Sequence, residues 1–150
     1  MSEEKHEFKI ESTWTGPSGG DGLLRNSGEA VRYGMPEGLG GAAGRTNPEE
    51  MLISAVAACY SITLAVLAER RKLAVSRIDL TATGEVVRQP GGTLKFVSIS
   101  LTPRITLLGG DPAQIETLRD FALKAEQYCP ISNAVRGNVE ITVDPEIVTG

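Results

Sequence analysis

The sequence contains one long apolar stretch, residues 51–68, in which no charged side chain occurs. The residues in front of it carry the signals of a helix start. Asn47 suits the N-cap, Pro48 suits the first helical position, and Glu50 stands where a capping box needs a carboxylate. The mostly basic residues 69–72 follow the stretch and suit a helix C-terminus. The chain must therefore accommodate one long helix, which we expect to begin at residue 48 and to close within residues 69–72.

This predicted helix is apolar nearly all round, so it requires burial on every side. Its length reaches the lower limit for a membrane-spanning helix, but its alanines and the polar Ser54, Ser61 and Thr63 favour burial within protein instead. A chain of 150 residues is too short to surround such a helix completely. We therefore expect a homodimer that packs two copies of this helix between two sheets, and we expect no membrane partner.

The overall composition limits the class of protein. A length of 150 residues predicts a single domain that spans residues 1–150. The net charge of −4 supplies no basic surface, which argues against a nucleic-acid partner. Residues 1–5 are polar and of mixed charge, unlike a secretory signal. The chain also has two cysteines far apart in the sequence, unlike the closely spaced cysteines of small secreted domains. We therefore expect a cytoplasmic protein whose thiols are kept reduced.

Alternating apolar and polar residues predict strands on either side of the helices. We expect strands at residues 8–14, 23–33, 78–86, 94–107 and 139–143, and a second, amphipathic helix with Asp111 as its N-cap. One face of the long hairpin is predicted to carry Ile78, Leu80, Ala82 and Val86. Because the strands come in runs with helices between them, the sequence predicts an α+β fold with antiparallel sheets.

Cys59 and Cys129 are the only cysteines of the chain. The helical neighbours of Cys59 are mostly apolar, a setting that raises the pKa of a thiol and suits a packing residue. Cys129 precedes Pro130, which places it at the N-cap of a short helix, where backbone N–H groups stabilise a thiolate. Local reasoning therefore names Cys129 as the reactive thiol, and it leaves plain packing and capping roles open for both cysteines.

Other common kinds of site find little support. His6 is the only histidine and lies near the N-terminus, so a Cys–His or Ser–His catalytic pair is not expected. One histidine and two distant cysteines do not make a zinc site. Residues 38–43 match a dinucleotide-binding glycine pattern, but they lack a preceding strand and a following βαβ unit. We expect neither a metal nor a bound cofactor.

Three segments together resemble the signature of one protein family. Residues 46–52 read TNPEEML, residues 57–61 read AACYS, and residues 129–134 read CPISNA. In this order they are similar to the signature regions of the OsmC/Ohr family of thiol-dependent hydroperoxide reductases, and the likeness covers residues 8–143. The resemblance implies an intertwined OsmC-like homodimer in which antiparallel sheets pack around long central helices.

The resemblance also implies a role for each cysteine. Cys59 would be the peroxidatic nucleophile, which attacks an organic (alkyl or lipid) hydroperoxide, releases an alcohol and becomes a sulfenic acid. Cys129 would be the resolving thiol that forms a disulfide with Cys59. A dithiol donor, such as a lipoyl-type dithiol, would then reduce this disulfide by exchange. These roles reverse those that local reasoning gave, so tertiary neighbours must activate Cys59.

In the family, an arginine held by the glutamate of the TNPE segment activates the nucleophile, and Glu49 matches that glutamate. The glycine-rich turn that often carries this arginine has none here, so Arg25 is our first choice, with Arg32 and Arg45 as alternatives. Glu49 lies about 15 Å from Cys59 along the helix axis, so it must act through an arginine from a loop or a partner subunit.

Two other functions remain open at this point. If no arginine reaches Cys59, the fold would serve as a non-catalytic module that binds an apolar ligand or partner in the dimer groove. Alternatively, the two cysteines would form a purely structural disulfide.

Overall fold

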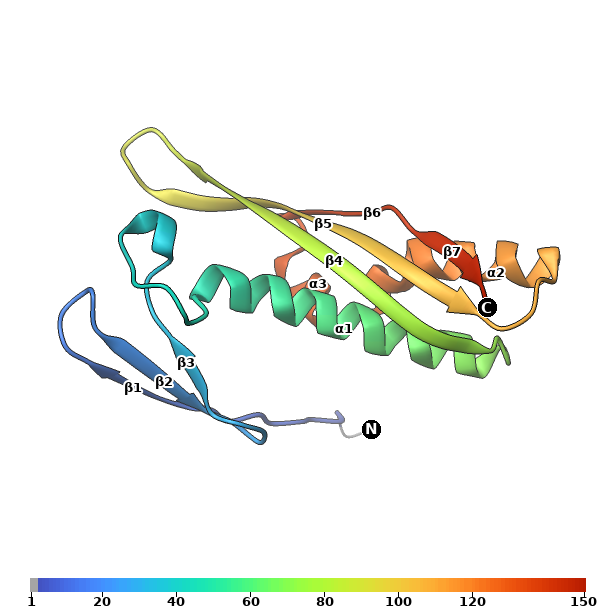
Figure 1. Ribbon diagram of the computed structural model, residues 1–150, viewed down its shortest axis with the longest axis horizontal. Coiled ribbons are helices and arrows are strands. Elements are labelled where there is room, and N and C mark those ends of the chain that lie inside the picture. The colour runs from blue at the N-terminus through green and yellow to red at the C-terminus, as the bar shows by residue number, and fades with distance from the viewer. Residues whose placement is uncertain (1–2) are drawn as a thin grey trace. The chain divides into compact units, whose positions relative to one another are not determined.

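The structure is a computed structural model that describes residues 3–150 (Figure 1). The chain divides between Met51 and Leu52 into two compact units, and we describe each unit by itself. The expectation of a single domain over residues 1–150 stays a prediction.

The first unit is built on a three-stranded antiparallel sheet in the order β1-β2-β3. Its elements are β1 (Glu11–Thr15), β2 (Asp21–Arg25), β3 (Val31–Tyr33) and a short 3-10 helix, η1 (Glu37–Leu39). The turn between β1 and β2 needs a glycine, because Gly16 has a φ of 95° that side chains with a Cβ rarely adopt. β1 begins later than predicted and leaves Phe8 92% exposed, since β2 offers no pairing partner beyond Arg25, opposite Glu11.

The long helix α1 (Pro48–Arg70) begins where the capping signals predicted. The side chain of Asn47 accepts a hydrogen bond from the Glu50 N–H at 2.8 Å, which confirms Asn47 as the N-cap. The Glu50 carboxylate, however, accepts a hydrogen bond from the Thr46 hydroxyl at 3.0 Å. The Glu50 carboxylate therefore binds the side chain of Thr46, the residue before the N-cap.

α1 ends at Arg70 because the chain turns into a left-handed conformation just after it. Lys72 has a φ of 55°. Its N–H donates to the Glu69 carbonyl at 3.0 Å, and the Leu73 N–H donates to the Ala68 carbonyl at 2.9 Å. These two hydrogen bonds form a Schellman cap, with a lysine at the position that glycine usually takes.

The second unit contains a four-stranded sheet in which β5 occupies the centre. β4 (Val75–Arg88) and β5 (Leu94–Leu107) form the predicted long antiparallel hairpin. β6 (Glu140–Val143) and β7 (Glu146–Thr149) both pair in parallel with β5, one after the other along its second edge. β7 was not predicted, because Pro145 interrupts the apolar alternation that precedes it.

The parallel pairing follows from the crossover between β5 and β6. This crossover consists of α2 (Pro112–Lys124), η2 (Ala125–Tyr128) and α3 (Pro130–Val135). Asp111 caps α2 as predicted, because its carboxylate accepts a hydrogen bond from the Ala113 N–H at 3.0 Å. The helices return the chain to the end of the sheet at which β5 began, so β6 runs in the same direction as β5.

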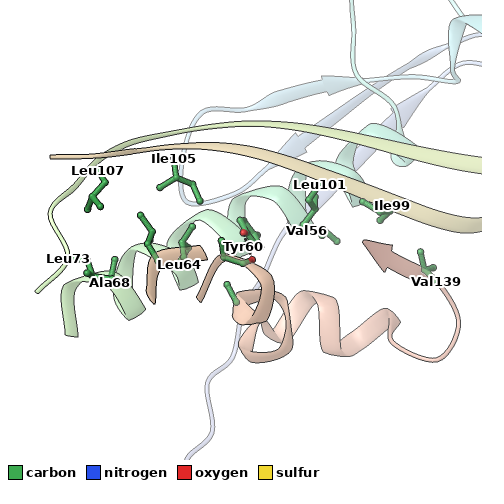
Figure 2. Packing of buried hydrophobic residues seen from close by; sticks show 13 residues of the cluster. Val56, Tyr60, Leu64, Ala68, Leu73, Ile99, Leu101, Ile105, Leu107 and Val139 are labelled. Atoms are coloured by element: carbon green, nitrogen blue, oxygen red, sulfur yellow. Dashed lines mark hydrogen bonds between the residues drawn. The ribbon is translucent and has the colours of Figure 1, made fainter. Parts of the chain in front are cut away.

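The hydrophobic core lies where α1, β5 and α2 pack together (Figure 2). α1 and α2 are tied directly by the Tyr60 hydroxyl, which donates to the Ala122 carbonyl at 2.6 Å. Burial raises the pKa of Tyr60 above its ordinary value of 10.0. One stripe of α1, one face of β5 and one face of α2 supply these fully buried core residues: Val56, Tyr60, Leu64, Ile99, Leu101, Ile105, Leu107, Leu118 and Ala122.

Two expectations of burial differ from the structure. Val86 is 38% exposed, because a register shift between Glu85 and Val86 ends the regular alternation of β4. α1 is fully buried along a single stripe only, and its Ile62 is 66% exposed. By length and composition this helix could cross a membrane, a test that the core helices of soluble proteins also pass. The α+β fold class is confirmed, and the homodimer stays a prediction.

Candidate redox site

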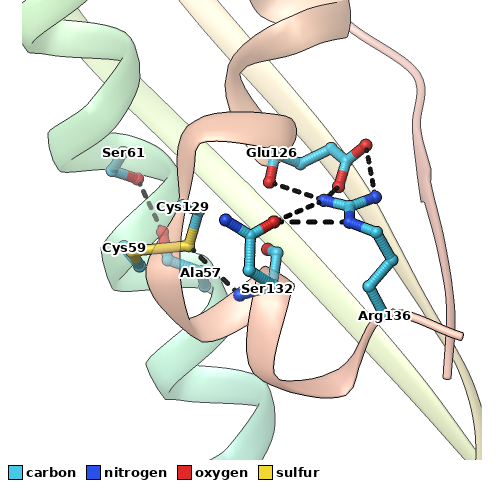
Figure 3. Close-up of a disulfide and its surroundings, with 8 residues drawn as sticks. Ala57, Cys59, Ser61, Glu126, Cys129, Ser132 and Arg136 are labelled. Carbon is cyan, nitrogen blue, oxygen red and sulfur yellow. Dashed lines mark hydrogen bonds and ion pairs between the residues drawn. A yellow bond between two sulfur atoms is a disulfide. The ribbon is translucent and has the colours of Figure 1, made fainter. Parts of the chain in front are cut away.

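The structure joins Cys59 of α1 and Cys129, the residue in front of α3, in a disulfide (Figure 3). Their Cα atoms are 5.8 Å apart, within the usual disulfide range of about 4.4–6.8 Å. The two residues are separated by 70 positions in the sequence. The fold thus brings the two cysteines of the chain together, while their catalytic roles stay predictions.

The two cysteines differ in exposure. Cys129 is 0% exposed, whereas Cys59 is only partly buried. Cys59 precedes Tyr60 of the buried stripe and therefore lies at the edge of that stripe on the helix surface. A molecule that arrives from solvent consequently has access to Cys59 rather than to Cys129.

A groove of about 490 Å³ is lined by residues that neighbour the two cysteines in the chain, although neither cysteine lines it. Ile62 and Thr63 line it one helical turn after Cys59, and Tyr128, which directly precedes Cys129, lines it from the other side. Its remaining walls are Val66, Leu67, Arg70, Arg71 and Phe121. The groove is therefore mostly apolar, with two arginines among its lining residues.

Cys129 is the N-cap of α3, as predicted, and Pro130 occupies the first helical position. Its sulfur accepts a hydrogen bond from the Ser132 N–H at 3.4 Å. The Ser132 hydroxyl is buried and has no hydrogen-bond partner among residues 3–150. Once the disulfide is reduced, the backbone N–H of Ser132 would remain available to donate to a Cys129 thiolate.

Sequence reasoning missed an ion pair between Glu126 and Arg136, the residues that flank Cys129 in the chain. Glu126, only 9% exposed, accepts a hydrogen bond from Arg136 Nη2 to its Oε2 at 2.8 Å. This hydrogen bond raises the pKa of Arg136 and keeps its guanidinium charged. The sequence signal was weak, because ten positions separate the two residues and no local pattern links them.

Glu49 lies in the first turn of α1 and belongs to the first unit. Its Oε2 is buried and has no hydrogen-bond partner in the part of the chain that the structure describes. Glu49 lines a pocket of about 320 Å³ whose other walls include Trp14, Tyr33, Met35 and Pro36. A buried carboxylate oxygen in such apolar surroundings requires a donor or a cation.

The three candidate arginines, all in the first unit, have very different surroundings. Arg25 is exposed on β2 and donates to the Thr13 hydroxyl at 3.1 Å. The Arg32 side chain is 70% exposed and lies 3.4 Å from an Asp21 carboxylate oxygen. The Arg45 side chain is only 7% exposed, forms an ion pair with Asp21 and donates to the Gly20 carbonyl at 2.7 Å. Arg45 is therefore the most firmly held of the three.

Within residues 3–150, no group of three or more His, Cys, Asp or Glu side chains is arranged to hold a metal ion.

Comparison with protein families matches residues 40–144 to the OsmC-like protein model. Among curated proteins, the chain is 33% identical over 144 residues to an organic hydroperoxide resistance protein of Xanthomonas axonopodis pv. citri, with 95% of this chain and 96% of that protein covered. It is 30% identical over 147 residues to the uncharacterized protein YmaD of Bacillus subtilis, with 97% of both covered.

Solved structures resemble this fold along nearly the whole chain. An organic hydroperoxide resistance protein from Elizabethkingia anophelis matches with a TM-score of 0.74 and 27% identity, covering 97% of this chain and 100% of that one. An OsmC-like protein from Mycoplasma pneumoniae matches with a TM-score of 0.77 and 19% identity over 97% of this chain and 99% of that one, a likeness of fold.

Proposed function

Because this chain belongs to the OsmC-like family, we propose that it is a thiol-dependent hydroperoxide reductase, a peroxidase that converts organic hydroperoxides to alcohols. The observation that carries the proposal is the pairing of Cys59 with Cys129. A disulfide between a partly buried and a fully buried cysteine is the product that a peroxidatic and a resolving thiol leave behind. The relatives named for organic hydroperoxide resistance support the same substrate class.

In the first step, the Cys59 thiolate attacks the distal oxygen of the hydroperoxide. The O–O bond breaks, the sulfur becomes a sulfenic acid, and the alkoxide leaves and takes up a proton to become the alcohol. Cys59 suits this role better than Cys129 because it is only partly buried and precedes the groove-lining Ile62 and Thr63 by one helical turn. The mostly apolar walls of the groove favour organic hydroperoxides over hydrogen peroxide.

In the second step, the Cys129 thiol attacks the sulfenic sulfur of Cys59. The S–O bond breaks, the S–S bond forms, and water leaves with the thiol proton. A dithiol donor then reduces the disulfide by exchange and is itself oxidised to a disulfide. Cys59 is the accessible sulfur for the mixed disulfide of that exchange. This cycle belongs in the cytoplasm, where dithiols are kept reduced, and it gives the protein an antioxidant role under peroxide stress.

The first step needs a cation that lowers the pKa of the Cys59 thiol. In our proposal an arginine of the first unit supplies this cation, and the Glu49 carboxylate orients it. The surroundings of the arginines favour Arg45 over our first choice, Arg25, because the Arg45 side chain is nearly buried and fixed by Asp21 and Gly20. The unpartnered Oε2 of Glu49 supports a role in orienting a cation.

The test treats fully reduced protein with one equivalent of cumene hydroperoxide and counts free thiols and alcohol. We expect both thiols to disappear as one equivalent of alcohol forms. Cys59→Ser should slow peroxide consumption by at least about three orders of magnitude. Cys129→Ser should complete one turnover and leave a sulfenic acid that dimedone traps.

Each alternative gives a different result in the same assay. Retention of both thiols contradicts the proposal and favours a non-catalytic module. A sulfenic acid on Cys129 rather than on Cys59 reverses the two roles. A purely structural disulfide shows slow reaction with peroxide together with a large drop in melting temperature on reduction.

A further inference from the structure

The segment that carries Cys129 is closed into a loop by one connected set of polar contacts (Figure 3). Both carboxylate oxygens of Glu126 face the guanidinium of Arg136, with Oε2 at 2.8 Å from Nη2 and Oε1 at 3.4 Å from Nη1. Arg136 Nη2 also donates to the Glu126 carbonyl at 3.1 Å. The Asn133 side-chain oxygen accepts from Nε of Arg136 at 3.3 Å and from Nη2 at 3.1 Å. Cys129 lies in the chain between Glu126 and Arg136, so this network brackets it.

The network also reaches the backbone of Cys129 itself. The Cys129 N–H donates to the Glu126 carbonyl at 3.3 Å, the same carbonyl that accepts from Arg136. The Cys129 carbonyl accepts from the Asn133 N–H at 2.9 Å. Movement of the Cys129 sulfur away from α1 therefore strains contacts on both sides of the residue.

Burial makes this ion pair different from the exposed pairs of the chain. The Glu126 side chain is 12% exposed and that of Arg136 is 45% exposed. On α2, by contrast, Lys124 and Asp120 form a pair at 3.0 Å whose side chains are 54% and 55% exposed. Exposed pairs of that kind contribute little to structure, whereas a forked carboxylate–guanidinium pair whose carboxylate is largely buried fixes the geometry of the residues that it joins.

We propose that Glu126, Asn133 and Arg136 form a positioning network that holds the Cys129 sulfur within bonding reach of Cys59 and thereby sets the rate and equilibrium of disulfide formation. The catalytic consequence rests on the proposed function, because the step that it accelerates is the attack of Cys129 on the Cys59 sulfenic acid. The equilibrium consequence does not rest on it, since any thiol–disulfide exchange at this pair depends on how closely the chain holds the two sulfurs.

The experiment equilibrates the protein in redox buffers of reduced and oxidised dithiothreitol and measures the fraction of Cys59–Cys129 disulfide. Glu126→Gln keeps the shape of the side chain but removes its charge. We expect it to shift the equilibrium toward the dithiol by about tenfold to a hundredfold, the range that loss of a hydrogen bond to a charged group gives. Arg136→Lys keeps the positive charge but removes the paired guanidinium N–H donors. It should shift the equilibrium in the same direction by a smaller factor.

Asp120→Asn is the matched control, because it removes one partner of the exposed pair on neighbouring α2. It should leave the equilibrium within about twofold of the natural protein. The proposal is overturned if Glu126→Gln and Arg136→Lys shift the equilibrium no more than Asp120→Asn, even when they lower the melting temperature. If Glu126→Gln does not fold, the proposal is tested by Arg136→Lys alone. It is then overturned if Arg136→Lys shifts the disulfide equilibrium no more than Asp120→Asn does.

A pulse of cumene hydroperoxide separates this proposal from the peroxidase proposal. With Glu126→Gln, we expect the Cys59 sulfenic acid to persist about tenfold longer while the rate of the first step stays unchanged. An unchanged lifetime overturns the catalytic part of the inference. A protein that consumes no peroxide refutes the proposed function, and the redox-buffer equilibrium still tests the network.

Discussion

Arg45 shows how much the surroundings of a residue add to its identity. The sequence offered three arginines of equal chemistry, and only Arg45 has a nearly buried side chain that is fixed by Asp21 and the Gly20 carbonyl. Arg25 is exposed and has a hydroxyl as its hydrogen-bond partner. A cation activates a thiol only when it is held in place, because a mobile surface arginine is screened by water.

From the proposed role of Arg45 we predict that Arg45→Met raises the pKa of Cys59 in the reduced protein by about one unit or more, the effect of losing an activating opposite charge. The measurement is the pH dependence of alkylation by iodoacetamide in a Cys129→Ser background, so that only Cys59 reacts. Arg25→Met is the matched control and should leave the pKa unchanged. The reverse outcome would restore Arg25 as the activating residue.

The residue-scale expectations succeeded where a local rule applied. Asn47 and Asp111 accept hydrogen bonds from the N–H groups of their own first turns, which capping rules predict from a few neighbouring residues. Glu126 and Arg136 escaped prediction because their partnership depends on the fold of the chain between them.

At the scale of elements, the contact between α1 and α2 depends on one tyrosine. The Tyr60 hydroxyl is buried and donates to the Ala122 carbonyl at 2.6 Å, so it satisfies a polar group inside an apolar interface. Loss of this hydrogen bond leaves the carbonyl without that donor. The hydroxyl must also remain protonated, because burial raises the pKa of Tyr60 above 10.0.

We therefore predict that Tyr60→Phe lowers the free energy of unfolding by about 1 kcal/mol at neutral pH. Above pH 10 the natural protein loses stability by up to about 1.4 kcal/mol per pH unit, because the unfolded tyrosine releases a proton that the folded one retains. Phenylalanine lacks this proton, so the difference between the two proteins should vanish near about pH 11. Urea unfolding of both proteins from pH 7 to pH 11 measures the difference in their free energies of unfolding. A difference that stays constant over this range would contradict the prediction.

The strands show both the strength and the limit of periodicity. Residues 97–107 alternate strictly, and the inward-facing Ile99, Leu101, Pro103, Ile105 and Leu107 of β5 are buried. Val86 broke the pattern because a register shift in the partner strand cannot be seen in the alternation of one strand alone. β6 and β7 were beyond prediction as parallel partners of β5, since their direction depends on the helical crossover.

At the scale of the whole molecule, α1 has more apolar surface than one chain covers. Its buried stripe leaves Ile62 66% and Val66 39% exposed. An apolar helix face of this kind is stabilised when a second protein surface removes it from water. We propose that a second copy of the chain packs against this face in a homodimer, with α1 near the dimer axis, and that this copy forms the outer wall of the groove that Ile62 and Val66 line.

We predict that the natural protein sediments as a dimer and that Ile62→Glu sediments as a monomer at micromolar concentration. An unpaired charge buried in an interface costs about 3–5 kcal/mol, which raises the dimer Kd at least about a hundredfold. Leu123→Glu is the matched control, because Leu123 is 48% exposed on α2, and it should remain dimeric. A natural protein that sediments as a monomer would contradict the homodimer.

The sequence by itself determined the position of α1, its N-cap at Asn47, the long hairpin and the likeness of its cysteine segments to one family. Such features depend on residues within a few positions of each other, so local rules reach them. The resemblance alone implied the Cys59–Cys129 disulfide, and the tertiary structure brought the two residues together across 70 positions. Only the tertiary structure decided that Cys59 is partly buried and that Glu126 pairs with Arg136 on either side of Cys129 in the chain. These features depend on packing between distant segments, which no local pattern encodes.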